Sequence, residues 1–183
     1  MKNLRYLSLS LLLFSGIVSC KKNDNLPKPK TATIYMKFKI DGVLQDCTGS
    51  FDSLVSKGKG VTARKEGLPF DPGKIYDIMG QANSNSVLTF RLYTDSLQVK
   101  EYIFKTELGY NIVELKGFDG RSYKRFYPYR AKGDSIILNI TRYSDKTIDG
   151  NFSGRLSQFD QAYTYQTVTI TEGEFKNVPL FYY

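Results

Sequence analysis

Hydrophobic and polar residues alternate along much of the chain after residue 31. In residues 34–40 (IYMKFKI), Ile34, Met36, Phe38 and Ile40 fall on one face and the residues between them on the other. Alternation with a period of two residues predicts a strand with one buried face. The pattern therefore predicts a series of strands, because similar runs occur at residues 74–80, 86–93, 112–118, 121–129, 135–143, 148–157 and 163–171.

The spacing of these runs predicts the fold class. Turn-forming residues separate them about every ten residues, as in an all-β sandwich or barrel. We therefore expect residues 31–183 to form one all-β domain, an antiparallel β-sandwich or alternatively a β-barrel, with about eight to ten strands and little helix. Residues 95–105 (DSLQVKEYIFK) are the one stretch where a helical turn is plausible, although residues 102–104 suit a strand equally well.

Residues 112–129 predict a β-hairpin in detail. Asp119-Gly120 lies between two alternating runs, and a type I′ turn needs positive φ at both central positions. A two-residue turn would place Glu114 opposite Arg125, whereas a shift of one residue would invert both faces. The core-facing side would then hold Val113, Leu115 and Phe126.

The other face of this hairpin is the candidate binding surface. Tyrosine offers a flat ring with a polar tip, and Arg and Lys attract carboxylate, sulfate or phosphate groups. A glycan, particularly an acidic one, could stack on such rings while its anions meet the cations. The alternative is that aromatic and long basic residues simply cover the sheet, which they suit well. The candidate ligand-binding residues are Lys116, Arg121, Tyr123, Arg125 and Tyr127.

The residue types argue against catalysis and metal binding. The chain has no His, which removes Ser-His and Cys-His nucleophile pairs and His-containing metal sites. It also lacks calcium-loop, phosphate-loop and Gly-x-Ser-x-Gly patterns. We therefore expect no cofactor, no metal and no enzyme activity. The alternative is a carboxylate-pair glycoside hydrolase, which would draw on Asp71, Asp77, Glu101, Glu107, Asp119, Asp149 and Glu172.

The first 19 residues predict a secretion signal. Lys2 and Arg5 precede an apolar run at residues 7–18 (LSLSLLLFSGIV). As a helix this run would reach roughly 18 Å at about 1.5 Å per residue, short of the ~30 Å hydrocarbon core of a bilayer. Residues 1–19 therefore indicate a signal peptide rather than a membrane span.

The signal ends in Ile17-Val18-Ser19-Cys20, which resembles the bacterial lipobox. That resemblance implies cleavage after Ser19 and acylation of Cys20, and several acyl chains would anchor the protein stably in a membrane. The alternative is an ordinary secretory signal with an incidental Cys. If Cys20 is acylated, residues 20–30 form the acylated Cys and a flexible tether. Residues 21–30 (KKNDNLPKPK) contain a single apolar residue and cannot pack.

Cys47 is the second of two cysteines. If Cys20 carries lipid, Cys47 has no disulfide partner within the chain. A free Cys is more often a small buried hydrophobe than a reactive thiol, so we expect Cys47 to be buried.

The ends of the mature chain resemble small uncharacterised Bacteroidota lipoproteins. Residues 149–156 (DGNFSGRL) and 168–175 (VTITEGEF) match a G-x-F-S-G-x-L … V-x-I-T-x-G-x-F ending, and residues 40–42 (IDG) match the opening of that group. The resemblance implies an outer-membrane lipoprotein with a compact β-sandwich, and it leaves open whether the periplasmic or the outer face carries the domain. Physically, Gly150, Phe152, Gly154 and Leu156 share one strand face, where small residues leave room for rings.

The distribution of charge limits the classes of binding partner that we expect. The formal net charge is +8, but residues 1–19 contribute +2, the tether +3 and the domain only +3. Overall basicity is therefore poor evidence for nucleic acid, and we expect none as a partner. The sequence predicts a non-catalytic binding or interaction module of the cell envelope, which meets the membrane through lipid on Cys20 and binds a glycan or another envelope protein. The alternative is a structural or partner-docking lipoprotein.

Overall fold

The computed structural model describes residues 32–49, 59–68, 71–83, 86–105, 111–117, 125–128, 133–159 and 165–183, which belong to one compact unit, Ala32–Tyr183. Every regular element in these residues is a β-strand, which confirms the all-β class. None of the described residues lies in a helix long and apolar enough to cross a membrane. The strands are β1 (Tyr35–Ile40), β2 (Val43–Asp46), β3 (Gly60–Leu68), β4 (Asp71–Asn83), β5 (Ser86–Tyr93), β6 (Glu101–Phe104), β7 (Ile112–Lys116), β8 (Arg125–Phe126), β9 (Ile136–Tyr143), β10 (Thr147–Phe159) and β11 (Tyr165–Tyr182).

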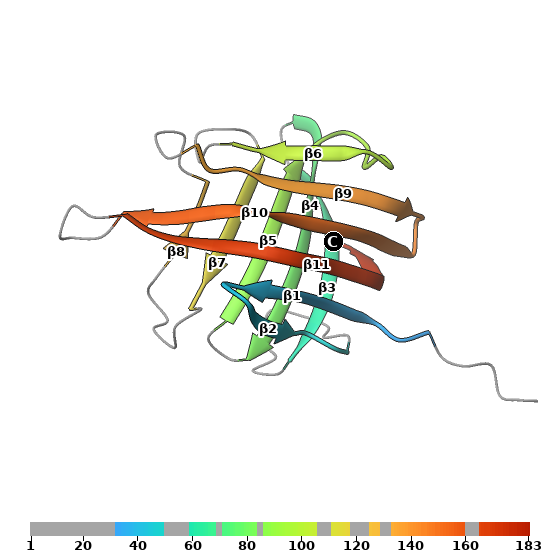
Figure 1. The fold of residues 1–183 in the computed structure, drawn as a ribbon. Coiled ribbons are helices and arrows are strands. Elements are labelled where there is room, and N and C mark those ends of the chain that lie inside the picture. The colour runs from blue at the N-terminus through green and yellow to red at the C-terminus, as the bar shows by residue number, and fades with distance from the viewer. Residues whose placement is uncertain are drawn as a thin grey trace, which may run out of the picture. The chain divides into compact units, whose positions relative to one another are not determined.

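The strands form one sheet that folds over into two layers. The order is β6-β9-β10-β11-β3-β4-β5-β7-β8, with β1 beside β11 and β2 beside β1. Figure 1 shows β6, β9, β10, β11, β1 and β2 in the front layer, with β3, β4, β5 and β7 crossing steeply behind them. The pairings are antiparallel except where β11 continues beside β3, which it meets in parallel at residues 180–182. Thus β11 joins the two layers.

The sheet is nearly closed on itself. A bridge between Tyr127 and Ser157 connects the end of β8 with β10. The Tyr127 N–H donates to Ser157 O at 2.9 Å, and the Ser157 N–H donates to Tyr127 O at 2.7 Å. The architecture therefore has the connectivity of a barrel and the two packed layers of a sandwich, so it combines the two expected alternatives.

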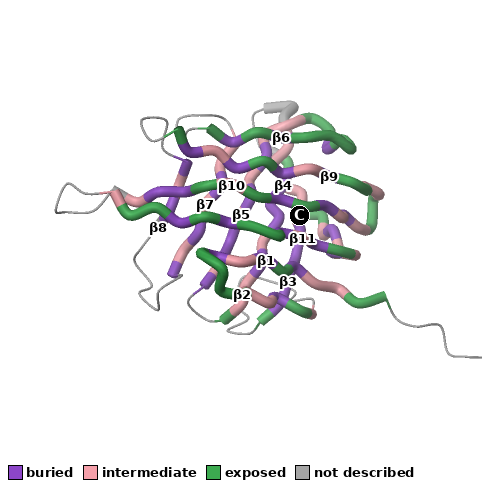
Figure 2. The backbone as a smooth tube through the Cα atoms, in the orientation of Figure 1, coloured by how far each residue is buried: buried purple, intermediate pink, exposed green. Residues whose placement is uncertain are grey.

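The core between the layers is built from alternate residues of each strand, and Figure 2 shows this alternation of buried and exposed positions along β10 and β11. Phe152 lies at its centre. Its ring centroid is 5.0 Å from that of Phe90, 5.6 Å from that of Phe38 and 6.3 Å from that of Phe175. One side chain on β10 therefore packs against β5, β1 and β11, and so connects both layers.

Two glycines make room for these rings: Gly150, as the sequence predicts, and Gly173. At Gly154, predicted to do the same, a Cβ would instead meet Ser135 O and Ile136. A Cβ at Gly150 would lie 2.5 Å from Cζ of Phe175, and one at Gly173 would lie 2.5 Å from Cδ2 of Phe152. Both distances are far below van der Waals contact. Glycine is required at these positions because a ring and a backbone carbonyl oxygen, that of Asn139 or of Phe152, occupy the space of a side chain.

The alternating runs predict most strands but not β2 and β3. β2 shows no alternation, because Val43 and Leu44 are both 60% exposed. In residues 95–105, where a helical turn and a strand were both open, the structure forms strand β6 over Glu101–Phe104. The two-residue β8 brings the described total to eleven strands, against about eight to ten predicted.

Candidate binding surface

The β7–β8 hairpin differs from its predicted register by two residues. Leu115 pairs with Phe126 and Lys116 with Arg125, so the prediction that Glu114 faces Arg125 is wrong. Strand β7 ends at Lys116, and the next residue, Gly117, has a φ of +66°, outside the extended region. The predicted turn at residues 119–120 lies outside the described residues.

For the residues that the structure describes, the predicted faces nevertheless hold, because a shift of two residues keeps each side chain on its side. Val113, Leu115 and Phe126 are buried, with at most 2% of their surface exposed. Glu114, Lys116 and Tyr127 are half-buried on the opposite side. We call this side the back face, meaning the outward side chains of β3, β4, β5 and β7 together with Tyr127, which follows β8.

Glu114 brings two of the predicted ligand-binding residues together. The Tyr127 hydroxyl donates a hydrogen bond to Glu114 Oε1 at 2.7 Å, and Lys116 Nζ lies 2.8 Å from Glu114 Oε2. The Glu114 side chain is only 15% exposed. The carboxylate therefore fixes a phenol ring and an ammonium group side by side on the back face.

The other predicted site residues are described in part or not at all. The backbone of Arg125 lies in β8. Arg121 and Tyr123 lie outside the described residues, as does the predicted lipidation site Cys20. The structure therefore places Lys116 and Tyr127 together and positions Arg125 opposite Lys116.

A row of charged residues extends the back face across three more strands. Arg64 on β3, Asp77 on β4 and Arg91 on β5 are direct cross-strand neighbours. Arg91 Nε donates to Asp77 Oδ1 at 2.7 Å, and Arg91 Nη2 and Arg64 Nη2 donate to Oδ2 at 2.8 and 2.9 Å. Asp77 is 1% exposed, whereas Arg64 is 17% and Arg91 35% exposed. These hydrogen bonds and the negative charge of Asp77 raise the pKa of Arg91 above its ordinary value.

Arg91 lies next to the predicted surface. Thr89 pairs with Glu114 and Arg91 with Ile112, so Arg91 follows the Glu114 row along β5 on the same face. Sequence reasoning missed Arg91, although the strict alternation of residues 86–93 places it with Thr89 and Tyr93 on the polar side. It missed Arg64 because the sequence pattern did not predict β3.

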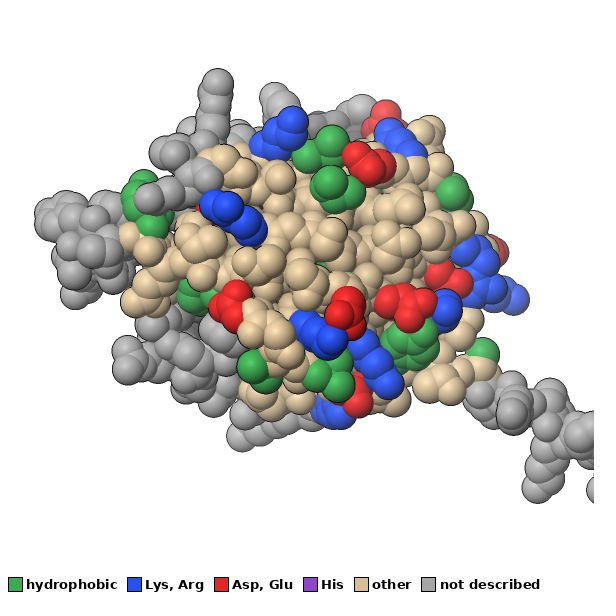
Figure 3. All heavy atoms as spheres, viewed as in Figure 1, with side chains coloured by type: hydrophobic (Ala, Val, Ile, Leu, Met, Phe, Trp, Pro, Cys, Tyr) green, Lys and Arg blue, Asp and Glu red, His purple; other side chains and the backbone are tan. Residues whose placement is uncertain are grey.

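The front layer presents a different surface. Figure 3 shows that the centre of this face is mostly uncharged and polar, with charged side chains concentrated toward its lower right. Its outward residues include Asn151, Ser153, Thr167, Thr169 and Thr171, all exposed. Its charged side chains include Lys39 and Lys176, which form ion pairs with Glu172 and Glu174.

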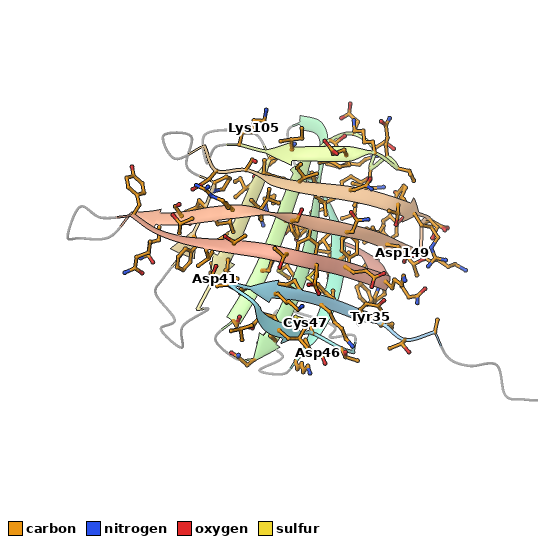
Figure 4. All side chains as sticks on the ribbon, viewed as in Figure 1. Tyr35, Asp41, Asp46, Cys47, Lys105 and Asp149 are labelled. Carbon is orange, nitrogen blue, oxygen red and sulfur yellow. The ribbon has the colours of Figure 1, made fainter. Side chains whose placement is uncertain are left out.

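Several carboxylates that could serve a hydrolase are held by cations. Asp77 is held by Arg64 and Arg91, as described above. Asp149, labelled in Figure 4, accepts from the Asn177 N–H at 2.7 Å and has Arg142 Nε 2.8 Å from its Oδ2. Glu172 lies 2.7 Å from Lys39 Nζ, whereas Glu107 and Asp119 lie outside the described residues. Within the described ranges, no group of three His, Cys, Asp or Glu residues could hold a metal ion.

Cys47 is fully buried, which confirms that prediction. Burial raises the pKa of its thiol to about 12, and the negative charge of Asp46 adds to the effect. The thiol is therefore neutral at physiological pH and packs as a small apolar side chain beside Met36.

Comparisons of the chain with protein-family models, with curated proteins and with solved structures find no match.

Proposed function

We propose that this protein is a lipid-anchored protein of the bacterial cell envelope and that its β-domain is a non-catalytic binding module. The anchor is Cys20, in an outer-membrane lipoprotein of the kind that the lipobox and the Bacteroidota-like motifs imply. The tether begins at that Cys and leads into β1, the first strand of the domain. Lysines in the tether can meet anionic lipid head groups.

The favoured ligand is a glycan, and the proposed surface is the back face around Glu114. The observation that carries this proposal is that Tyr127 and Lys116 both contact the Glu114 carboxylate, which lies next to the row formed by Arg64, Asp77 and Arg91. A phenol ring offers a stacking surface, and carboxylate and guanidinium groups hydrogen-bond to hydroxyls. Charges of both signs alternate across the face, so neutral glycans fit it as well as acidic ones.

Binding of the soluble domain, residues 31–183, to a glycan array tests this proposal. The Tyr123→Ala, Tyr127→Ala double variant should lose most of the signal. Tyr35→Ala is the matched control, because Tyr35 makes a similar bond, at 2.8 Å to Glu174 Oε2, in the front layer. Equal signals from the wild type and the double variant would refute the back-face surface.

The second candidate is a structural or partner-docking lipoprotein. Exposed apolar residues favour it: Val43 and Leu44 on β2, Val99, and Ile103 and Ile137 on β6 and β9. Substitution of Leu44 by Asp would impair this function and leave glycan binding unchanged, whereas Tyr127→Ala would do the opposite.

A carboxylate-pair hydrolase is the third and least supported candidate. It needs an acid and a base that face each other across a cleft. Asp77, Asp149 and Glu172 each form an ion pair with a cation instead.

The anchor has its own test. A metabolically incorporated fatty acid should label the full chain and be absent from the Cys20→Ser variant. Equal labelling of both chains would rule out Cys20 as the acylated residue.

A further inference from the structure

The outer edge of β6 carries an ordered pattern of side chains. β6 is the last strand in the sheet order and, among the described strands, pairs with β9 alone. Tyr102 and Phe104 are buried, whereas Glu101, Ile103 and the following Lys105 are exposed. Figure 3 shows hydrophobic side chains close together over β6 and β9, where Ile103 lies opposite Ile137 and is 46% exposed.

Within the described part of the chain, the outer backbone groups of β6 face no other strand. The Ile140 N–H donates to Lys100 O at 3.0 Å, so these two residues form a hydrogen-bonded pair of the β6–β9 ladder. Hydrogen-bonded and non-hydrogen-bonded pairs alternate in antiparallel sheets. The backbone N–H and C=O groups of Tyr102 and Phe104 therefore form hydrogen bonds with β9. Those of Glu101 and Ile103 point the other way, to the outer edge of β6.

The charges at this edge are also available. No hydrogen bond or ion pair of the Glu101 or Lys105 side chain occurs within the described part of the chain. Figure 4 shows Lys105 at the outer margin of the front layer, pointing away from the sheet. Glu101 and Lys105 lie two residues before and two residues after Ile103, so opposite charges flank an exposed apolar residue symmetrically.

We propose that β6 is a self-association surface that pairs with β6 of a second copy of this chain. The two strands run antiparallel about a two-fold axis at Ile103. In this register Ile103 faces Ile103 of the second copy, and Glu101 faces Lys105 of the second copy on both sides of the axis. The backbone groups that point outward belong to the same residues, so hydrogen bonds and ion pairs form in one register.

The alternative role of such charges is protection of the edge. Natural sheets keep edges unpaired with short strands and with Lys. Charges that only protect an edge strand from pairing need no particular spacing. Glu101 and Lys105, however, are placed symmetrically about Ile103, so the edge is complementary to the same edge of a second copy. Self-association is separate from the proposed glycan binding, because β6 lies in the front layer and the proposed ligand surface is the back face.

Cysteine cross-linking of the full chain in the membranes of an expressing bacterium tests this pairing. Hydrogen-bonded antiparallel partners have Cα atoms about 5.5 Å apart, within the range that a disulfide spans. The Ile103→Cys variant should give a disulfide-linked dimer under mild oxidation. Leu44→Cys, on the exposed β2, is the matched control and should stay monomeric. Equal linking of both variants, no linking, or linking to a protein of another size would overturn the proposal.

Charge exchange tests the register itself. In the Ile103→Cys background, Glu101→Lys or Lys105→Glu should lower the linked fraction at least about fivefold, because like charges then face each other. The double exchange Glu101→Lys, Lys105→Glu should restore it, as should co-expression of the two single variants. A double exchange that stays as low as the single variants, or single variants that link like the parent, would overturn the register.

Discussion

The Tyr127 hydroxyl donates a hydrogen bond to Glu114 Oε1 at 2.7 Å, and the other oxygen of that carboxylate lies 2.8 Å from Lys116 Nζ. The front layer repeats this arrangement. Tyr35 donates to Glu174 Oε2 at 2.8 Å, and Lys176 Nζ lies 2.7 Å from Glu174 Oε1. A Tyr-Glu-Lys cluster thus occurs on both layers, so the front-layer cluster can serve as the control for the back-face cluster.

The two clusters should contribute similarly to stability. Removal of the hydroxyl in Tyr127→Phe or Tyr35→Phe should lower the free energy of unfolding by about 1 kcal/mol, because each variant loses one hydrogen bond to a charged acceptor that is partly exposed. Urea denaturation measures this value. A loss above about 3 kcal/mol for Tyr127→Phe alone would show that Tyr127 has a larger structural role than this bond.

Asp77 should be the most important charged residue for stability among those described. Asp77→Asn removes the negative charge between two guanidinium groups that are mostly buried, and should cost about 3 kcal/mol. Glu172→Gln is the control, because Glu172 is 67% exposed and its pair with Lys39 should contribute less than about 1 kcal/mol. Denaturation of the two variants at neutral pH checks the difference, and equal losses would contradict the importance of burial.

The alternation of hydrophobic residues predicts the all-β class and the side of β7 and β8 that faces the core, because burial of one face imposes a period of two. It does not predict hairpin register, because a shift of two residues leaves the same side chains on each face. It also misses β3, where Val61, Thr62 and Ala63 are consecutively buried and break the alternation. A local sequence pattern cannot predict the parallel pairing of β11 with β3, because it joins residues 63–65 with residues 180–182.

The candidate surface was predictable only in part, because a local pattern does not show which strands pair. Lys116 and Tyr127 follow from the local alternation of one hairpin. Arg64, Asp77 and Arg91 become neighbours only when β3, β4 and β5 pair, and Asp77 in the sequence is one carboxylate among many.

The glycine at position 173 should resist substitution. Gly173→Ala would place Cβ against the Phe152 carbonyl oxygen and 2.5 Å from the Phe152 ring, and should cost about 1 to 3 kcal/mol through overpacking. Phe152→Leu should recover part of this cost in the double variant, since the smaller side chain leaves room. Gly67→Ala is the control, because no atom lies within 4 Å of its Cβ position, and it should change stability by less than about 0.5 kcal/mol. Chemical denaturation compares the three, and additive costs in the double variant would contradict the clash.

Cys47 should make stability depend on pH in the alkaline range. Its pKa is raised from 9.0 to about 12 in the folded chain, so the neutral thiol stabilises the fold fully below pH 9.0. As the pH rises from 9.0 toward 12, the unfolded chain ionises first and this contribution is lost. The free energy of unfolding of the wild type should therefore fall faster with pH than that of Cys47→Ala. Parallel pH profiles, or rapid reaction of the native thiol with a disulfide reagent at neutral pH, would contradict the burial of Cys47.

We propose above that the back face of an anchored β-domain binds a ligand. A crystal structure of residues 31–183 is the most direct measurement, because it shows how the side chains of Tyr123, Arg125 and Tyr127 lie relative to one another and to solvent. We predict that these three side chains line an open concavity next to Glu114 and Arg91. Side chains that diverge, or that are covered by other residues of the same chain, would contradict the claim.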